Sequence, residues 1–184
     1  MKPAVFLGRE GTINSEKNYL HRVEDREWIP GAPEAIARLN HLDYLIVVVT
    51  NQTGIAGGFY SEQHVHILHD YASTELEKCD SKIDVYYYCS HYPDFDSTCS
   101  CRKPAPGFIL QGAMDLNIDI PRSWIIGDAL VDVQPGEAVN FRSVLVRIGY
   151  GVGDGNDKLR RTIVVESIVQ AVEVITLNRP SFRQ

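Results

Sequence analysis

Apolar and polar positions follow each other along the chain in two different rhythms. Short, continuous apolar runs are typical of buried strands, whereas apolar residues that recur every three or four positions indicate helices with one buried face. The strand-like runs cover residues 4–7, 44–49, 83–88, 123–126 and 143–147. The helix-like stretches cover residues 31–42, 61–77, 107–116, 131–139 and 164–177. Because strand and helix alternate throughout, we expect an α/β protein with a doubly wound, mostly parallel sheet.

The remaining segments are predicted to connect these elements. Residues 15–30 and 90–103 are polar and lack periodicity, and residues 54–60 and 149–157 are rich in glycine. All four are interpreted as loops, and none is long enough to form a large cap domain over the sheet. We therefore expect one domain over residues 1–178, followed by a frayed tail over residues 179–184.

Composition and charge narrow the class of protein. A length of 184 residues with 44% hydrophobic and 23% charged residues suits one soluble globular domain. The net charge of −6 argues against nucleic acid as the main partner, since binding to a phosphate backbone needs a basic surface. No apolar run is long enough to span a membrane. The first residues lead straight into a strand, so we expect no signal peptide.

Three of the four cysteines lie in one short segment together with a histidine. The spacing is Cys89-x-His91-x7-Cys99-x-Cys101, and the gap between the two pairs lets the loop turn back so that both reach one ion. Three thiolates and one imidazole form a closed tetrahedral zinc site, which holds a loop in shape and leaves no position for a catalytic water. The alternative is four unconnected loop residues. Clustered cysteines favour metal binding in a reducing compartment, and so we expect a cytoplasmic protein.

The fourth cysteine and the helical histidines have plainer interpretations. Cys79 falls on a predicted helix and is expected to be a buried apolar side chain. His64, His66 and His69 lie on the helix that Ser61 is expected to cap, with His64 in the position of a capping-box glutamate. They could ligate a metal, but no cysteine or carboxylate accompanies them at matching spacing. Surface or half-buried histidines are therefore the favoured interpretation.

Candidate anion-binding groups follow the second and third predicted strands. Thr50 and the backbone around Asn51 come at a strand end, where a hydroxyl and free N–H groups form an anion pocket. Arg102 and Lys103 follow the cysteine-rich loop directly and supply two cations for a phosphoryl group. The alternatives are a capping role for Thr50 and a solvated basic pair. The adjacent metal loop favours the binding role, because it would fix where the two cations point.

Two carboxylates follow the fourth predicted strand. Asp128 comes at the strand end, and Asp132 comes one helical turn later. Together they could hold a hard cation such as Mg2+ through oxygen ligands and water. Helix N-capping by one of them is an equally open alternative.

The loop after the first strand is where an open α/β sheet places its ligand. It reads Gly8-Arg9-Glu10-Gly11-Thr12-Ile13-Asn14. Gly11 allows a tight turn, and Thr12 and Asn14 supply acceptor-rich side chains. The candidate chemistry of this loop depends on what its first and third residues can do.

Taken in order, these segments resemble the haloacid dehalogenase (HAD) superfamily. Within it they resemble the D-glycero-D-manno-heptose-1,7-bisphosphate phosphatase family, which is also similar to histidinol-phosphatase. The matching segments span about residues 4–150 and comprise Gly11–Asn14, Val48–Gly54, the cysteine-rich loop with Arg102-Lys103-Pro104-x-Pro106-Gly107, and Gly127-Asp128-x3-Asp132. The resemblance implies that Thr50 and Lys103 bind the transferring phosphoryl group and that Arg102 helps to hold the substrate. It also implies that Asp128 is one of the Mg2+ ligands.

The first motif departs from this family at both catalytic positions. The family's Asp-x-Asp-Gly-Thr loop uses its first aspartate as the nucleophile and its second as the general acid/base. Here those positions are Gly8 and Glu10. Gly8 can form no aspartyl-phosphate and supplies no Mg2+ ligand. Glu10 is a methylene longer than aspartate, and a displacement of about 1 Å can cost on the order of 100-fold in rate. Ala129 stands where many relatives carry lysine.

Three hypotheses follow from this degenerate motif. The favoured one is a pseudophosphatase that binds a phosphorylated sugar or a protein partner, in heptose or polysaccharide synthesis. The second is a slow or altered sugar phosphatase that uses Glu10, or a bound water, with Mg2+ on Asp128 and Asp132. The third is that Gly8 and Glu10 were introduced to trap a substrate, although one change would be enough. The protein is expected to hold about one zinc and little magnesium.

Overall fold

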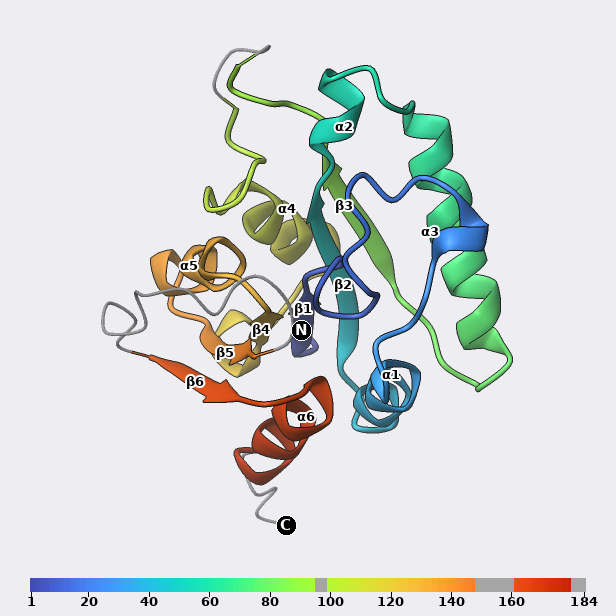
Figure 1. Cartoon of the computed structure of the whole chain (residues 1–184). Coiled ribbons are helices and arrows are strands. Elements are labelled where there is room, and N and C mark those ends of the chain that lie inside the picture. The colour runs from blue at the N-terminus through green and yellow to red at the C-terminus, as the bar shows by residue number, and fades with distance from the viewer. Residues whose placement is uncertain (95–98, 148–160, 180–184) are drawn as a thin grey trace.

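The protein is built on a single six-stranded sheet, as seen in a computed structural model that describes residues 1–94, 99–147 and 161–179 (Figure 1). The strand order is β3-β2-β1-β4-β5-β6, and every neighbouring pair is parallel. The order reverses at β1, so the crevice beside this strand is the expected ligand position. The strands are β1 (Ala4–Leu7), β2 (Leu45–Asn51), β3 (Val85–Cys89), β4 (Trp124–Gly127), β5 (Arg142–Val146) and β6 (Thr162–Val165).

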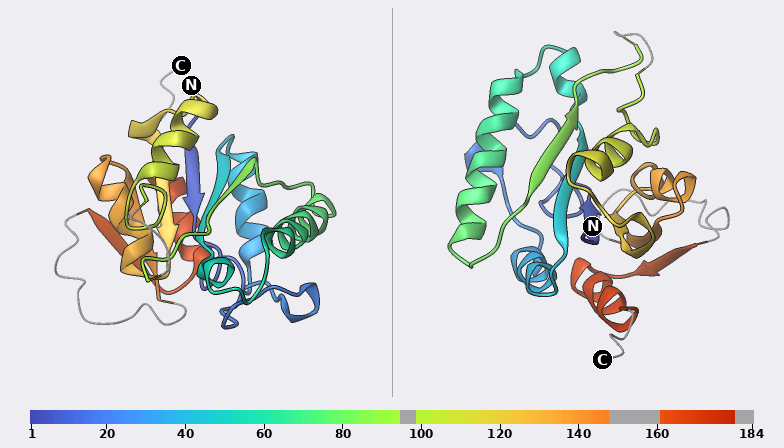
Figure 2. Two further views of the ribbon diagram at one scale, coloured as in Figure 1. Left: turned by 90° about the horizontal axis from the view of Figure 1, so that it is seen from above. Right: turned by 180° about the vertical axis from the view of Figure 1, so that it is seen from behind.

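Helices cover both faces of the sheet (Figure 2). They are α1 (Ala32–His41), α2 (Thr53–Ala56), α3 (Glu62–Glu77), α4 (Gly107–Asp115), α5 (Leu130–Ala138) and α6 (Ile168–Leu177), with short 3-10 turns η1 (Val23–Asp25) and η2 (Ile120–Arg122). Alternate strand residues face opposite ways. Val5 and Leu7 therefore join the core packed by α1 and α6, while Ala4 and Phe6 join the core packed by α4. The doubly wound α/β architecture predicted from the sequence is confirmed.

The last predicted helix was too long. Its first two residues, Val164 and Val165, belong instead to the edge strand β6 (Thr162–Val165), which pairs in parallel with β5. The helix α6 begins only after Ser167, whose side chain accepts a hydrogen bond from the Gln170 backbone N–H. The β-branched run at residues 163–165 favours a strand, and Ser167 is a helix-start signal inside the predicted helix.

Three smaller predictions also need correction or comment. The short helix α2 (Thr53–Ala56) includes residues 54–56 of the glycine-rich connection that was predicted to be a loop over residues 54–60. Cys79 follows the end of α3 and is exposed rather than buried. By contrast, the capping box at the start of α3 is confirmed, because the Ser61 backbone N–H donates to Nδ1 of His64 at 3.2 Å.

Two predicted segments reach beyond the described residues. The glycine-rich loop 149–157 lies outside them, as do residues 180–184 of the expected tail. Arg179, the first residue of that tail, donates a hydrogen bond to the Leu42 carbonyl at 3.0 Å. Across the ranges that are described, no helix is both long and apolar enough to cross a bilayer.

Candidate active site

The carboxyl ends of three central strands bring the candidate residues together. The loop after β1 carries Gly8 to Asn14, the end of β2 carries Thr50 and Asn51, and the segment after β4 carries Asp128. The Gly8 N–H donates to the Ile126 carbonyl at 3.0 Å, which ties the first loop to β4. The parallel sheet therefore explains why residues more than a hundred positions apart meet at one edge.

The turn after β1 is held against Asp128. Gly11 has a φ of +77°, and a Cβ atom there would lie 2.2 Å from the Asp128 carboxylate, so only glycine fits. The Thr12 hydroxyl donates to Oδ1 of Asp128 at 3.0 Å. Burial, followed by the nearby carboxylate of Asp132, raises the pKa of Asp128 to about 7.

Thr12 crowds the position of Gly8, where the resemblance expects the nucleophile. A Cβ atom on Gly8 would lie 2.6 Å from the Thr12 hydroxyl oxygen and 3.3 Å from the Thr12 Cβ. The Thr12 side chain thus lies against Gly8, in the space beside the backbone where a longer side chain would begin. No attacking group projects from this position, because glycine has no side chain.

The Glu10 carboxylate accepts hydrogen bonds from several directions. The Arg9 Nε donates to it at 2.9 Å, and a second guanidinium nitrogen of Arg9 contacts the same oxygen. The Thr50 hydroxyl donates at 3.1 Å, and the Gln52 amide donates to both oxygens at 3.2 and 3.3 Å. Burial by itself would raise the pKa of Glu10, but the charge and hydrogen bonds of Arg9 outweigh it and lower the pKa to about 2. Glu10 is therefore a fixed anion that only accepts hydrogen bonds.

Arg9 lies beside Glu10 in the candidate site and His69 lies beside Arg9, and the sequence did not predict this placement for either residue. Arg9 is only 4% exposed, and its Nη1 lies 3.1 Å from Nε2 of His69. His69 is buried, contrary to the expected surface or half-buried position. Burial, followed by the charge of Arg9, lowers the pKa of His69 to about 3, so the neutral ring accepts from the guanidinium. The available signal was the placement of His69 on the same face of α3 as buried Val65 and Ala72.

Gln52 and Tyr60 also escaped the sequence interpretation. Besides Glu10, the Gln52 amide donates to the Thr50 hydroxyl oxygen at 2.8 Å. Its own carbonyl accepts from the Tyr60 hydroxyl at 2.7 Å. Burial, and then the charge of Glu10, raises the pKa of Tyr60 to about 12, so this hydroxyl stays a donor. Together these bonds fix the donors that face Glu10.

Lys103 is buried and paired with Asp132. Its ammonium donates to Oδ1 of Asp132 at 2.6 Å and to the Val49 carbonyl at 2.8 Å. Asn51 holds the Lys103 backbone from both sides, with its amide nitrogen donating to the carbonyl at 3.2 Å and its oxygen accepting from the N–H at 3.1 Å. The other oxygen of Asp132 accepts from the Ala129 N–H at 3.0 Å. The capping alternative for Asp132 is therefore realised.

Arg102 lies apart from this group. Its guanidinium donates to the His91 carbonyl at 3.2 Å and lies 5.1 Å from the centre of the Tyr92 ring. It does not line the hollow of about 290 Å³ that opens over the candidate site. The charged residues lining that hollow are Arg9, Glu10, Glu16, Lys103, Asp128 and Asp132.

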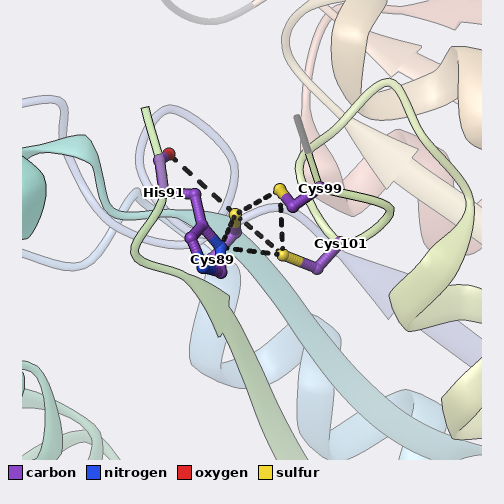
Figure 3. Close-up of side chains that lie close together, drawn as sticks. All are labelled: Cys89, His91, Cys99 and Cys101. Carbon is purple, nitrogen blue, oxygen red and sulfur yellow. Dashed lines mark hydrogen bonds between the residues drawn. The ribbon is translucent and has the colours of Figure 1, made fainter. Parts of the chain in front are cut away.

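The four predicted zinc ligands converge at the end of β3 (Figure 3). The three sulfurs lie 3.0 to 3.6 Å from one another. The His91 Nδ1 lies 3.6 Å from the Cys89 sulfur and 3.4 Å from the Cys101 sulfur. Two sulfurs bound tetrahedrally to one zinc, at about 2.3 Å each, would be about 3.8 Å apart. The cluster therefore fits a small tetrahedral metal ion, and four protein ligands leave no open coordination position.

Asp128 and Asp132 fit poorly the magnesium site that the second hypothesis places on them. Gly8 offers no ligand, and both oxygens of Asp132 are held by Lys103 and by the Ala129 N–H. Asp128 remains, with one oxygen accepting from Thr12. Within the part of the chain that the structure describes, the cysteine–histidine cluster is the one group of three or more such ligands close enough to share an ion. A single carboxylate with no fixed companion is a weak Mg2+ ligand set.

The fold and this site define a class of protein. A parallel sheet of this order, with a site at its switch point, is common to several doubly wound α/β folds, and the relatives of this chain place it among the HAD-like hydrolases. A family described as HAD-hydrolase-like matches residues 100–171. The D-glycero-β-D-manno-heptose-1,7-bisphosphate 7-phosphatase of Haemophilus ducreyi is 38% identical over 180 residues, covering 95% of this chain and 98% of that one. The enzyme of the same name from Escherichia coli strain K12 is 40% identical over 153 residues, or 80% of each chain.

Solved structures agree with these relatives. The D,D-heptose 1,7-bisphosphate phosphatase of B. bronchiseptica, complexed with magnesium and phosphate, superimposes with a TM-score of 0.88 at 28% identity. The alignment covers 97% of this chain and 100% of that one. The chain belongs to the family of D-glycero-β-D-manno-heptose-1,7-bisphosphate 7-phosphatases. The resemblance inferred from the sequence motifs is thereby confirmed.

Proposed function

We propose that this protein is a pseudophosphatase, a heptose-bisphosphatase-like protein that has lost covalent phosphoryl transfer. The observation that carries the proposal is the nucleophile position. Gly8 has no side chain, and the Thr12 hydroxyl lies 2.6 Å from where its Cβ would be. Without an attacking group, the route through an aspartyl-phosphate is closed.

Glu10 does not restore the lost chemistry. Both of its oxygens accept hydrogen bonds from fixed donors. A general acid needs a proton to give, and a carboxylate whose pKa lies near 2 holds none at neutral pH. The alternative of a slow phosphatase, acting through Glu10 or a bound water with Mg2+ on Asp128 and Asp132, is weakened by the hydrogen bonds that commit Asp132 to capping α5 and pairing with Lys103.

The remaining functional assignments extend this proposal. The protein binds a partner in heptose or polysaccharide synthesis, which the motifs predict to be a phosphorylated sugar or a protein, and it works in the cytoplasm. A structural zinc ion holds Cys89, His91, Cys99 and Cys101 together, as the donor set and its spacing favour. Magnesium is not required for this role.

The test is phosphate release from heptose 1,7-bisphosphate and other sugar bisphosphates in the presence of Mg2+. The native chain is expected to release none above the buffer background. A Gly8→Asp, Glu10→Asp double variant is expected to turn over, because it regains nucleophile and acid/base on an intact scaffold. The Thr12 side chain must rotate to admit the new Asp, so the thermal midpoint of the variant is measured alongside.

The Glu10→Asp single variant is the matched control for this test. It regains the acid/base group but not the nucleophile, and it should remain silent. Turnover by the native chain itself, at a rate that scales with protein concentration and survives repeated purification, would falsify the pseudophosphatase proposal.

A further inference from the structure

Every strong donor around the candidate phosphoryl position already faces an internal acceptor. Arg9 uses two nitrogens on Glu10 and the third on His69. The Thr50 hydroxyl donates to Glu10. The Lys103 ammonium donates to Asp132 and to the Val49 carbonyl. The side-chain donors that would recognise a phosphoryl group are thus present and buried, and all three nitrogens of Arg9, the Thr50 hydroxyl and two of the three N–H groups of Lys103 face internal acceptors.

We propose that the Glu10 carboxylate is a built-in occupant of this anion pocket, so that the site excludes phosphate and phosphate esters and takes a ligand without a phosphoryl group. This inference rests on the proposed function, since it concerns what a non-catalytic site binds. Glu10 reaches the pocket because it is one methylene longer than aspartate. A phosphoryl oxygen and a carboxylate oxygen cannot accept from the same hydrogen of Thr50 at once.

The charges around the hollow support this exclusion. Arg9 pairs with Glu10, and Lys103 pairs with Asp132. Among the described residues, no ion pair involves the other two lining carboxylates, Glu16 and Asp128. Asp128 is partly protonated at neutral pH because its pKa is raised to about 7, so the unpaired negative charge that a phosphate dianion would meet in the native site comes mainly from Glu16, and it disfavours the dianion.

An adjoining hollow of about 270 Å³ offers partners for an uncharged ligand. It shares Glu10 and Glu16 with the first hollow and adds the amides of Asn18 and Gln52 and the hydroxyl of Tyr60. Among the residues that the structure describes, no lysine or arginine lines it. Amides and hydroxyls both donate and accept, as the hydroxyl groups of a sugar do, so this lining suits a hydroxyl-rich ligand better than an anion.

The experiment removes the internal carboxylate and asks whether phosphate replaces it. Native protein, Glu10→Ala and Glu10→Gln are titrated with inorganic phosphate, and binding is followed by calorimetry and by the thermal midpoint. Native protein is expected to show no heat and no shift with millimolar phosphate. Glu10→Ala should bind phosphate and gain several degrees of midpoint, because the anion replaces the lost partner of Arg9. Glu10→Gln should show a smaller gain, because its side chain still fills part of the pocket.

The matched control is Glu16→Gln, which removes a lining charge that contacts none of these donors. It should gain far less phosphate binding than Glu10→Ala, because all the internal acceptors remain, and chloride at equal ionic strength should not stabilise Glu10→Ala. Should Glu10→Ala fail to fold, phosphate during refolding is expected to rescue it, and Glu10→Gln provides the second variant. Equal phosphate binding by native protein and both Glu10 variants would overturn the inference. So would a gain in Glu16→Gln that matches Glu10→Ala.

These outcomes are independent of the phosphatase assay. Inorganic phosphate binding involves no turnover, so it reports only whether Glu10 blocks the anion pocket. If native protein excludes phosphate yet hydrolyses a sugar bisphosphate, only the pseudophosphatase proposal is wrong. If native protein binds phosphate but releases none from esters, only the proposal that Glu10 excludes phosphate is wrong.

Discussion

The cysteine–histidine cluster and the loop after β1 lie at the same edge of one sheet, yet they differ in what they retain. At the end of β3, four ligand atoms converge within 4.8 Å, and none of the four residues is missing from the expected motif. At the end of β1, the backbone turn is present with Gly11 at a φ of +77°, but Gly8 and Glu10 stand where the family motif has two aspartates. One region matches its expected motif residue for residue, and the other departs from it at two positions.

This difference shows that a site can have the hydrogen bonds that fix its side chains without having the residues that the family motif places there. The loop after β1 is as buried and as hydrogen-bonded as an active site, with Arg9, Thr50 and Gln52 all directed at one carboxylate. These donors therefore bind a carboxylate of the protein itself, Glu10, and not a substrate. A site can therefore look complete by burial and network while its acceptor belongs to the protein itself.

The largest expected effect is at the cluster, where removing one ligand tests whether this region is structural. Cys101→Ser should lose bound zinc, measured by elemental analysis, and should lower the thermal midpoint strongly, because structural zinc sites contribute about 10 kcal/mol or more of apparent binding free energy. Cys79→Ser is the matched control, since Cys79 is an exposed free cysteine outside the cluster. If native protein purified without chelators contains no zinc, the cluster is not a structural zinc site and the contrast with the loop after β1 is lost.

The second effect tests whether the loop after β1 is a rigid network. Arg9→Met leaves the Glu10 carboxylate without its cation, and breaking such a buried pair costs about 3–5 kcal/mol of unfolding free energy. Urea denaturation measures the loss. Arg22→Met is the control, because the Arg22–Asp25 pair is exposed and should contribute about 1 kcal/mol or less. Equal losses in the two variants would mean that the Arg9 pair behaves as a surface contact.

A double variant tests directly whether Arg9 and Glu10 stabilise the protein as a pair. Arg9→Met combined with Glu10→Gln removes both charges, so no unpaired ion stays buried. Its loss of unfolding free energy should be smaller than the sum of the two single losses. Strict additivity would argue that the two side chains do not act as a pair.

The smallest effect is a pH dependence at Asp128. The pKa of this buried carboxyl is raised to about 7, from an ordinary value of 3.8. The folded protein therefore holds a proton there that the unfolded chain has lost, and the contribution of Asp128 to stability falls as the pH rises from about 4 to about 7. Asp128→Asn should flatten the change in unfolding free energy over this interval, measured in magnesium-free buffer. An unchanged pH profile in Asp128→Asn would show that the group titrates normally.

The parts of the molecule that the sequence predicted well depend on local patterns. The cluster followed from the Cys89-x-His91 and Cys99-x-Cys101 spacings, because close spacing along the chain limits how far apart the ligands can lie. The central strands followed from continuous apolar runs. The edge strand β6 was missed because its β-branched residues run directly into the apolar face of α6, so that two elements shared one stretch of hydrophobic residues.

The parts that the sequence did not predict depend on contacts between distant segments. The contact between Arg9 and His69 joins residues 60 positions apart. It exists only because α3 packs with this histidine facing inward. The pairing of Lys103 with Asp132 likewise depends on how the segments after β3 and β4 meet. Motif spacing identified Lys103 and Asp132 as candidates but neither Arg9 nor His69, and tertiary packing decides which donor meets which acceptor.

The position of β3 links the cysteine–histidine cluster to an edge of the sheet. Among the described residues β3 pairs with β2 alone, and its last residue, Cys89, is a member of the cluster. Unprotected strand edges recruit strands from other molecules. A metal ion bound at the cluster would tie the end of this strand to the loop that follows it. Removing such an ion is therefore expected to fray β3 first, and to lead at high concentration to edge-to-edge aggregation before global unfolding.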